Sequence, residues 1–201
     1  MLRSLLRTPA VIGDDEYERL LKDVFDATAK LLGREPTNHR GPESEEGWKV
    51  AGFQATAPDR EFRGGGLLGL HCLLHALEHH PATCSKLLEG PFPFAAASIN
   101  MTLVAARLAG VASADDAMKA SISDKSPQNA PRDCLSLLAT SHAGFFEVHA
   151  LALDALERAR SDVDASKMDF MGCAVAAREE VSILLSHAPK DCLLYTSPSP
   201  R

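Results

Sequence analysis

The sequence predicts an all-α protein, a single helical domain of about seven helices. Apolar residues recur at spacings of three and four along most of the chain, as on the buried face of an amphipathic helix. No stretch of useful length alternates apolar and polar residues, and no internal repeat is found. Hydrophobic residues make up 45% and charged residues 24% of the 201 residues, which is typical of one globular core.

The first long helix is expected to begin at Asp15, which can cap it together with Glu18 three residues later. Gly33 ends this helix, and residues 33–47 contain no aliphatic side chain, so we expect a solvated connector there. Residues 1–14 are expected to form a frayed or weakly docked N-terminal extension. Their basic, leucine-rich start also fits a short organelle transit peptide, which remains the alternative.

A leucine-rich helix is expected from Gly66 to about His79, where Pro81 follows. The face opposite the leucines carries His71 and His75, spaced as a helical metal pair would be, with Glu78 nearby. The glutamate does not lie between the histidines, and no cysteine pair completes a set of four ligands. We therefore expect solvated histidines and no metal.

The remaining helices follow from the same spacing and from turn residues between them. The last is expected to be capped by Ser166 and Asp169 and to run through Ser186. The others are expected at residues 82–90, 94–109, 133–140 and 144–163. The end of the chain, residues 188–201, resembles translated sequencing-adapter read-through, and we leave it out of the fold.

Composition and motifs exclude several functions. A net charge of −6 gives no basic footprint for nucleic acid, and no apolar run is long enough to span a membrane. There is no phosphate-binding P-loop, no Gly-x-Ser-x-Gly elbow and no Cys/His nucleophile, so we expect neither intrinsic catalysis nor a cofactor. The odd number of cysteines without a Cys-x-x-Cys pair favours a reducing, cytoplasmic compartment: Cys72, Cys84, Cys134, Cys173 and Cys192.

The most informative stretch runs from the only tryptophan, Trp48, to Arg63 and the three glycines that open the leucine helix. Gly64, Gly65 and Gly66 permit positive φ and close approach of another backbone. Arg63 is therefore expected at a loop–helix corner, with its cationic side chain directed outward from a rigid base. The alternative is a structural arginine, held in a partly buried ion pair with Glu61, Asp59 or a distant carboxylate.

This stretch resembles the motif of the ELMO domain family, and the resemblance covers roughly residues 15–187. The family pattern is a Trp, then Gly-aromatic-Gln, a Pro, an acidic residue two before an Arg, and Gly-x-Gly before a leucine helix. Glu61 stands where the acidic residue is usually Asp. The matching positions are Trp48, Gly52, Phe53, Gln54, Pro58, Arg63, Gly64 and Gly66.

The resemblance implies a GTPase-activating protein for Arf-family, especially Arf-like, GTPases in the GTP-bound state. Arg63 would be the residue inserted into the GTPase site. The other branch of the family adds armadillo-like repeats and a PH domain, works with DOCK proteins as a Rac exchange scaffold, and lacks this arginine. The length of the chain and Arg63 favour the first branch. A non-catalytic module that contacts a GTPase or an exchange-factor partner is the alternative, and the partner GTPase is expected to recruit the protein to membranes.

The resemblance also indicates which residues surround Arg63 at the contact. Gln54, Glu61, Gly64, Gly65 and Gly66 are expected in the partner-binding loop, and Gly65 occupies the open position of Gly-x-Gly, so Gly65→Met should be tolerated. Gln54 could orient the attacking water, although a hydrogen bond to loop backbone is the simpler role. The aromatic rings of Trp48 and Phe53 are expected to anchor the loop to the core.

Overall fold

The computed structural model describes residues 1–34, 48–49, 51–54, 58–112 and 142–186. All secondary structure in these ranges is helical, which confirms the expected all-α class. The helix expected at 133–140, most of the 33–47 connector and the 188–201 tail lie outside the described residues. The α-helices are α1 (Leu2–Arg7), α2 (Asp15–Leu31), α4 (Gly66–His79), α5 (Pro81–Glu89), α6 (Phe94–Leu108), α9 (His142–Asp162) and α10 (Phe170–Ser186); η1 (Pro58–Arg63) and η2 (Lys167–Asp169) are 3₁₀ helices.

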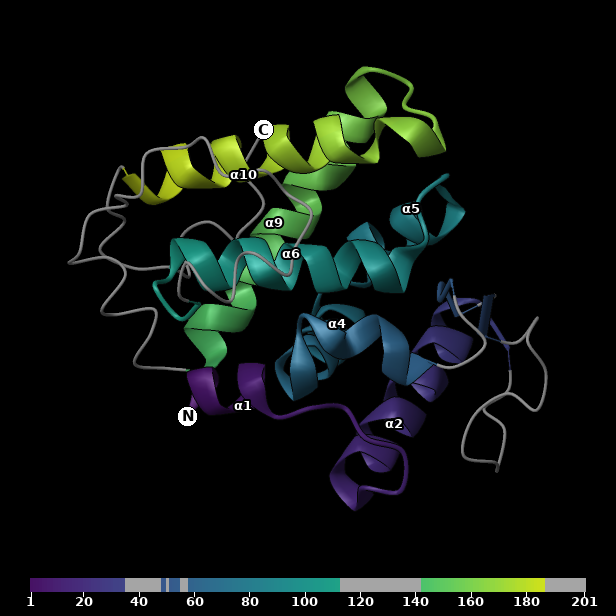
Figure 1. Ribbon diagram of the computed structural model, residues 1–201. Helices are drawn as coiled ribbons and strands as arrows, with labels where there is room; N and C mark the ends of the chain where they lie inside the picture. The colour runs from purple at the N-terminus through teal and green to yellow at the C-terminus, as the bar shows by residue number, and fades with distance from the viewer. Residues whose placement is uncertain (35–47, 50, 55–57, 113–141, 187–201) are drawn as a thin grey trace.

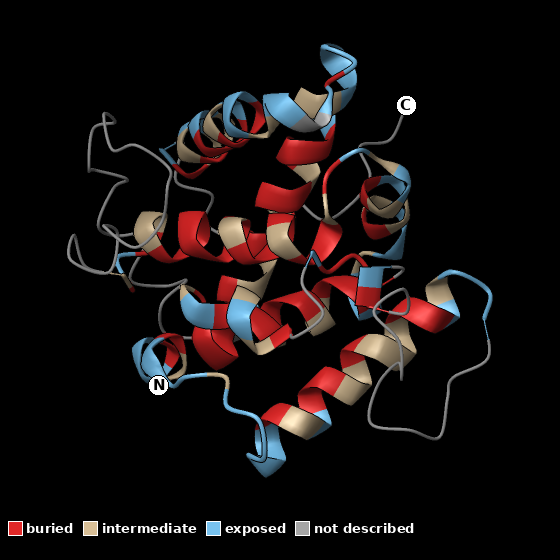
Figure 2. Ribbon diagram, turned by 45° about the vertical axis from the view of Figure 1, so that its right-hand side comes forward, coloured by how far each residue is buried: buried red, intermediate tan, exposed pale blue. Residues whose placement is uncertain are grey.

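Helix α4 lies at the centre of the arrangement and packs against α1, α2, α5, α6 and α9. In Figure 1, α6 and α4 lie one above the other, with α10 above them and α1 and α2 below. Helix α9 crosses α6 and pairs closely with α10. The leucines of α4 therefore face several neighbours at once, and residues on more than one of its faces are buried (Figure 2).

Helix α6 forms the core of the molecule, as its almost continuously apolar sequence predicts. Eleven of its fifteen residues are buried. Two of its polar side chains donate hydrogen bonds to backbone carbonyls one turn earlier in the same helix. The Thr102 hydroxyl donates to the Ser98 carbonyl at 3.0 Å, and the Asn100 amide donates to the Ala96 carbonyl at 2.8 Å. Such back-bonding satisfies polar groups that are removed from water. No helix in the described ranges combines the length and apolarity needed to cross a membrane.

The expectation of a weakly docked N-terminus is wrong for α1. Leu2 and Leu6 are buried against the core. The Leu67 amide at the start of α4 donates to the Thr8 carbonyl at 3.1 Å. From the other side of α1, the Arg3 guanidinium donates to the carbonyls of Gly110 and Val111, each at 3.0 Å. These contacts join α1 to the beginning of α4 and to the end of α6.

Capping residues set the ends of two helices. At α2 the N-cap is Asp14, one residue earlier than expected: its carboxylate accepts from the Tyr17 amide at 2.9 Å, while Glu18 accepts from the Gly13 amide at 3.1 Å. Before α10 the expected box is confirmed. The Asp169 carboxylate accepts from the Ser166 amide at 2.8 Å and from its hydroxyl at 2.7 Å. These two hydrogen bonds hold the pKa of Asp169 below its ordinary value.

Candidate functional site

Arg63 is the last residue of η1 and lies on the molecular surface, as the sequence predicts. Successive side chains of a 3₁₀ helix point about 120° apart, so adjacent residues can differ completely in burial. Phe62 is fully buried, whereas Arg63 beside it is exposed. Within the part of the chain that the structure describes, Arg63 has no hydrogen bond or ion pair, and neither Glu61 nor Asp59 binds it. The Arg63 side chain is therefore an exposed cation, and the backbone that carries it is anchored by the buried side chain of Phe62.

Four aromatic rings fix the segment that carries Arg63. The rings of Phe25, Trp48, Phe53 and Phe62 follow one another with centroid separations of 5.9, 5.4 and 6.0 Å, each in an edge-to-face arrangement. Such pairs contribute roughly 0.5–1.5 kcal/mol each beyond the area that they bury. The expected role of Trp48 and Phe53 as core anchors is confirmed, because both rings are buried. This aromatic column, as we call the four rings, connects α2 to η1.

Glu61 links the Gly-aromatic-Gln part of the motif to the part that contains Arg63. Its carboxylate accepts a hydrogen bond from the backbone amide of Gln54 at 2.5 Å. The hydrogen bond of Gln54 is thus made by its backbone amide, and its side chain is exposed. A bond from a neutral amide to a carboxylate is charge-assisted and stronger than a neutral one. Glu61 therefore brings Gln54 next to the turn that ends in Arg63.

The three glycines after Arg63 serve two different purposes. Only Gly66 has positive φ, at +53°, and a Cβ there would lie 2.5 Å from the Thr8 carbonyl oxygen of the α1 end. Gly65 has φ −99°, and its Cβ would lie 3.3 Å from Ile99 of α6, while that of Gly64 would lie 3.2 Å from Leu103. The expectation that all three relieve positive φ is wrong for Gly64 and Gly65; they allow α6 to approach.

The burial of these glycines also changes how they can contribute to partner binding. Gly65 and Gly66 are buried, and Gly64 is half-buried. Gln54, Arg63 and the exposed part of Gly64 are accessible to a partner protein, whereas Gly65 and Gly66 act only through the position that they give to Arg63. Their role in the contact remains a prediction, and it is an indirect one.

We expect Gly65→Met to lower the free energy of unfolding, which reverses the tolerance expected from the open motif position. The new side chain would begin at 3.3 Å from the Ile99 methyl and 3.4 Å from the Gly69 Cα, where there is no room for three further heavy atoms. Overpacking of this kind costs about 1–3 kcal/mol. The measurement is urea denaturation, with Gly172→Met as the control.

Gly172 suits this control because it lies in α10 with nothing within 4 Å of the added Cβ. There the substitution replaces a helix-interior glycine and should be neutral or slightly stabilising. Equal unfolding midpoints for the two variants would contradict the packing described for Gly65.

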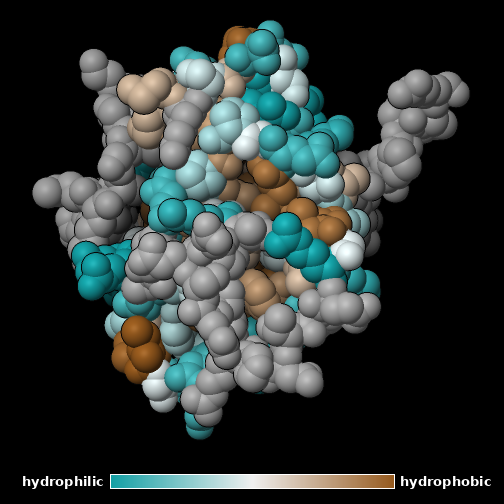
Figure 3. Space-filling model, turned by 90° about the vertical axis from the view of Figure 1, so that its right-hand side faces the viewer, coloured by the Kyte–Doolittle hydropathy of each residue, from teal (hydrophilic) through white to brown (hydrophobic). Residues whose placement is uncertain are grey.

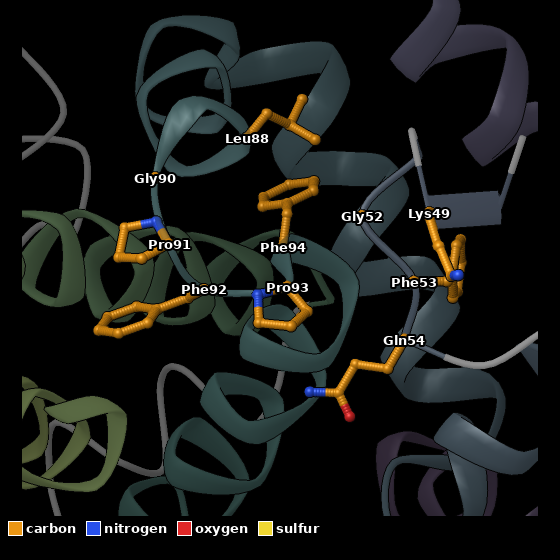
Figure 4. Close-up of a pocket in the computed structure, with 10 residues that line it drawn as sticks. All are labelled: Lys49, Gly52, Phe53, Gln54, Leu88, Gly90, Pro91, Phe92, Pro93 and Phe94. Atoms are coloured by element: carbon orange, nitrogen blue, oxygen red, sulfur yellow. The ribbon is translucent and has the colours of Figure 1, made fainter. Parts of the chain in front are cut away.

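A cleft of about 540 Å³ lies beside this loop. Figure 4 shows the Gln54 side chain extending from its loop at the edge of this cleft and passing below Pro93 in the view. Its two walls are joined at Gly52, whose carbonyl accepts from the Ala95 amide at 2.8 Å, and whose φ of +85° requires glycine. The walls are formed by Lys49, Gly52, Phe53 and Gln54 on one side and Leu88, Gly90, Pro91, Phe92, Pro93 and Phe94 on the other.

His71 and His75 of α4 are half-buried rather than solvated, whereas His79 is exposed as expected, and His71 and His75 do not form a pair. The His71 ring lies 3.5 Å from a Glu16 oxygen, whereas His75 Nε2 lies 3.0 Å from Glu147 of α9. Burial lowers the pKa of His75 below its ordinary value, although Glu147 opposes this effect. No pattern in the sequence indicates that Glu147, 72 positions from His75, is its neighbour.

A serine and a histidine also meet in the core. Ser98 Oγ and His149 Nε2 lie 3.1 Å apart, and both residues are fully buried. Burial lowers the pKa of His149 to about 3, so the ring is neutral near pH 7. With no surface through which a substrate could reach it, this pair is a structural hydrogen bond and not a nucleophile with its base.

The surface seen in Figure 3 carries separate hydrophobic patches among hydrophilic side chains in the part that the structure describes. Exposed large hydrophobic residues are spread over several elements and include Val11, Ile12, Val163, Met168 and Ile183. Scattered exposure of this kind is normal for a folded protein and does not define an interface. Gln54, Arg60 and Arg63 are exposed polar residues on the segment that the aromatic rings anchor.

Comparison with known proteins gives a consistent picture. The profile of the ELMO/CED-12 family matches residues 1–173. ELMO domain-containing protein C of Dictyostelium discoideum is 42% identical over 57 residues, 27% of this chain and 9% of that protein. ELMO domain-containing protein B of the same organism is 31% identical over 98 residues, 46% of this chain and 32% of that protein. The chain thus covers about a third or less of these relatives, and no solved structure matches it.

Proposed function

The chain belongs to the ELMO/CED-12 family, and from this premise we propose that it is a GTPase-activating protein for Arf-family small GTPases in their GTP-bound state. Arg63 is the residue that it inserts into the partner's nucleotide site. The observation that carries the proposal is the exposed Arg63 next to the fully buried Phe62. A protein of this kind does not catalyse a reaction alone, because the nucleotide and the attacking water are bound by the GTPase.

The chemistry requires one guanidinium and little else from this chain. During GTP hydrolysis negative charge spreads over the oxygens of the transferred phosphoryl group, and an arginine supplied by a second protein stabilises it. The gain is roughly 10³–10⁵ in rate. A guanidinium suits this role because its planar donors can bind several phosphate oxygens at once.

The surroundings of Arg63 support such a role. The aromatic column restrains the loop on its buried side, and the exposed Glu61–Gln54 hydrogen bond restrains it at the surface. Arg60, three residues earlier in η1, is exposed as well, whereas the two acids of η1, Asp59 and Glu61, are half-buried, so the exposed charges of this helix are positive. Local positive charge favours the approach of a phosphate-bearing site. Gln54, at the same edge, is the second exposed group within reach of the contact.

The experiment is single-turnover GTP hydrolysis by a panel of Arf-family GTPases, with and without this protein. We expect at least one GTPase to hydrolyse GTP faster in proportion to the added protein, until its binding saturates. Binding to a GTPase without any acceleration would contradict the proposal and favour a non-catalytic module. The proposed place of action is the cytoplasmic face of the membrane on which the partner GTPase resides.

A further inference from the structure

Three metal-binding side chains converge near the C-terminal end of α4, whereas Arg63 precedes its N-terminal end. His75 lies in α4, His80 lies between α4 and α5, and Glu147 lies in α9. One ligand atom from each can be chosen so that all three lie within 4.8 Å of one another. His75 Nε2 is 3.0 Å from one Glu147 oxygen, and His80 Nε2 is 3.3 Å from the other.

The hydrogen bonds of this cluster are incomplete. His80 Nε2 and the second Glu147 oxygen, Oε2, are buried atoms without a hydrogen-bond partner among the described residues, although they lie 3.3 Å apart. Buried polar atoms are nearly always satisfied, and an exception calls for an unseen partner. The side chains are nevertheless not sealed off: 17%, 25% and 18% of the His75, His80 and Glu147 side chains are exposed, so an ion could enter.

We propose that His75, His80 and Glu147 form a binding site for a divalent transition metal of the zinc type. Two imidazoles and one carboxylate are a ligand set that Zn²⁺ accepts, with water in the fourth position. Zinc–ligand bonds of about 2.0–2.2 Å place neighbouring ligand atoms of a tetrahedron roughly 3.3–3.6 Å apart. The observed separations of 3.0 and 3.3 Å involve different oxygens of Glu147. One ligand atom from each residue lies within 4.8 Å of the others, so the side chains have to draw together slightly to reach the tetrahedral spacing.

The surroundings hold the ligands in place. The His75 ring lies between the His79 ring, at 4.4 Å between centroids, and the Phe146 ring, at 5.2 Å. His80 is fixed by its position between two helices, since its amide donates to the Ala76 carbonyl at 2.8 Å. A bound ion would link the α4–α5 corner to α9. This site is independent of the role proposed for Arg63.

The test is a titration of the metal-free full-length protein with zinc, in competition with a chromophoric chelator. Cys134 and Cys192 are replaced by serine, so that these thiols cannot bind the ion; Cys72, Cys84 and Cys173 are buried. We expect one equivalent to bind. Glu147→Gln and His80→Ala should each weaken binding about a hundredfold or more, since even residues that only support a ligand cost 10–100-fold. Glu78→Gln, which removes an exposed acid from α4, the helix that carries His75, is the matched control and should bind as wild type.

Cobalt supplies a readout that needs no variant. Co²⁺ in the site should give the intense visible absorption of a four-coordinate ion, and Tm should rise with metal concentration because the ion binds the folded chain. Failure of the wild-type chain to bind one equivalent of either ion would overturn the proposal. Equal zinc affinity in folded Glu147→Gln and Glu78→Gln proteins would overturn it as well. After either result, the cluster would be interpreted as an ion pair between histidine and Glu147 without a metal.

Discussion

Replacing Arg63 by alanine is expected to return GTP hydrolysis by the partner GTPase to its unstimulated rate, a loss of roughly 10³–10⁵-fold. The free energy of unfolding should stay within about 0.5 kcal/mol of wild type, as for other surface substitutions. The reason is that Arg63 is exposed and makes no bond within the described ranges. Arg63→Lys should fail largely as well, because an ammonium does not reproduce the planar donors of a guanidinium. Single-turnover hydrolysis and thermal melting check both expectations.

Arg60→Ala is the matched control for Arg63→Ala. Arg60 is an exposed arginine in the same 3₁₀ helix, so its removal changes the net charge equally. Its loss should slow association in a salt-dependent way and leave the rate at saturating protein nearly unchanged. If Arg63→Ala lowered stability together with activity, the arginine would be structural. If both variants lost activity equally at saturation, the effect would be one of charge alone.

Gly66→Val is expected to destabilise the fold by about 3 kcal/mol or more. A β-branched residue at φ +53° is strained by about 1–3 kcal/mol. In addition, its Cβ would lie 2.5 and 2.6 Å from the carbonyl oxygens of Thr8 and Leu6, so α1 would have to move. Overpacking adds about 1–3 kcal/mol. Activation should fall in proportion to the fraction unfolded, and urea denaturation measures the change in stability.

Gly33→Val separates the two contributions. Gly33 has a similar φ of +66°, but nothing lies within 4 Å of an added Cβ. This control should therefore show the strain of the backbone without the collision, and it should lose clearly less stability than Gly66→Val. Equal losses would mean that α1 does not cover Gly66 in solution. A stable but inactive Gly66→Val protein would restore the direct contact with the GTPase that the motif suggested.

The helical fold could be predicted because apolar spacing alone reports a buried helix face. Helix α1 was not expected because its six residues span less than two turns and carry only three apolar residues, Leu2, Leu5 and Leu6, too few for a period to be recognised. The exposure of Arg63 could be anticipated from the motif. It follows the buried Phe62 in the same 3₁₀ helix, so the contrast in burial depends only on adjacent residues. The burial of Gly65 could not be anticipated, because Ile99, which contacts it, is far away in the sequence.

The histidines show the same limit. The spacing of four residues on one helix indicates that His71 and His75 lie side by side as a possible ligand pair. A helical period reveals only neighbours on the same element. The potential ligands that the structure groups with His75 are His80, beyond the end of the helix, and Glu147, which α9 brings from another part of the chain. The contact that groups ligands is tertiary, and a single sequence carries no signal for it.

The aromatic column has a consequence for the thermodynamics of association. A flexible loop that becomes ordered on binding loses backbone and side-chain entropy at that moment, and its affinity falls accordingly. Here Trp48, Phe53 and Phe62 already restrict the loop in the free protein. The entropy is lost when the chain folds, so binding has to immobilise little more than the Arg63 side chain itself.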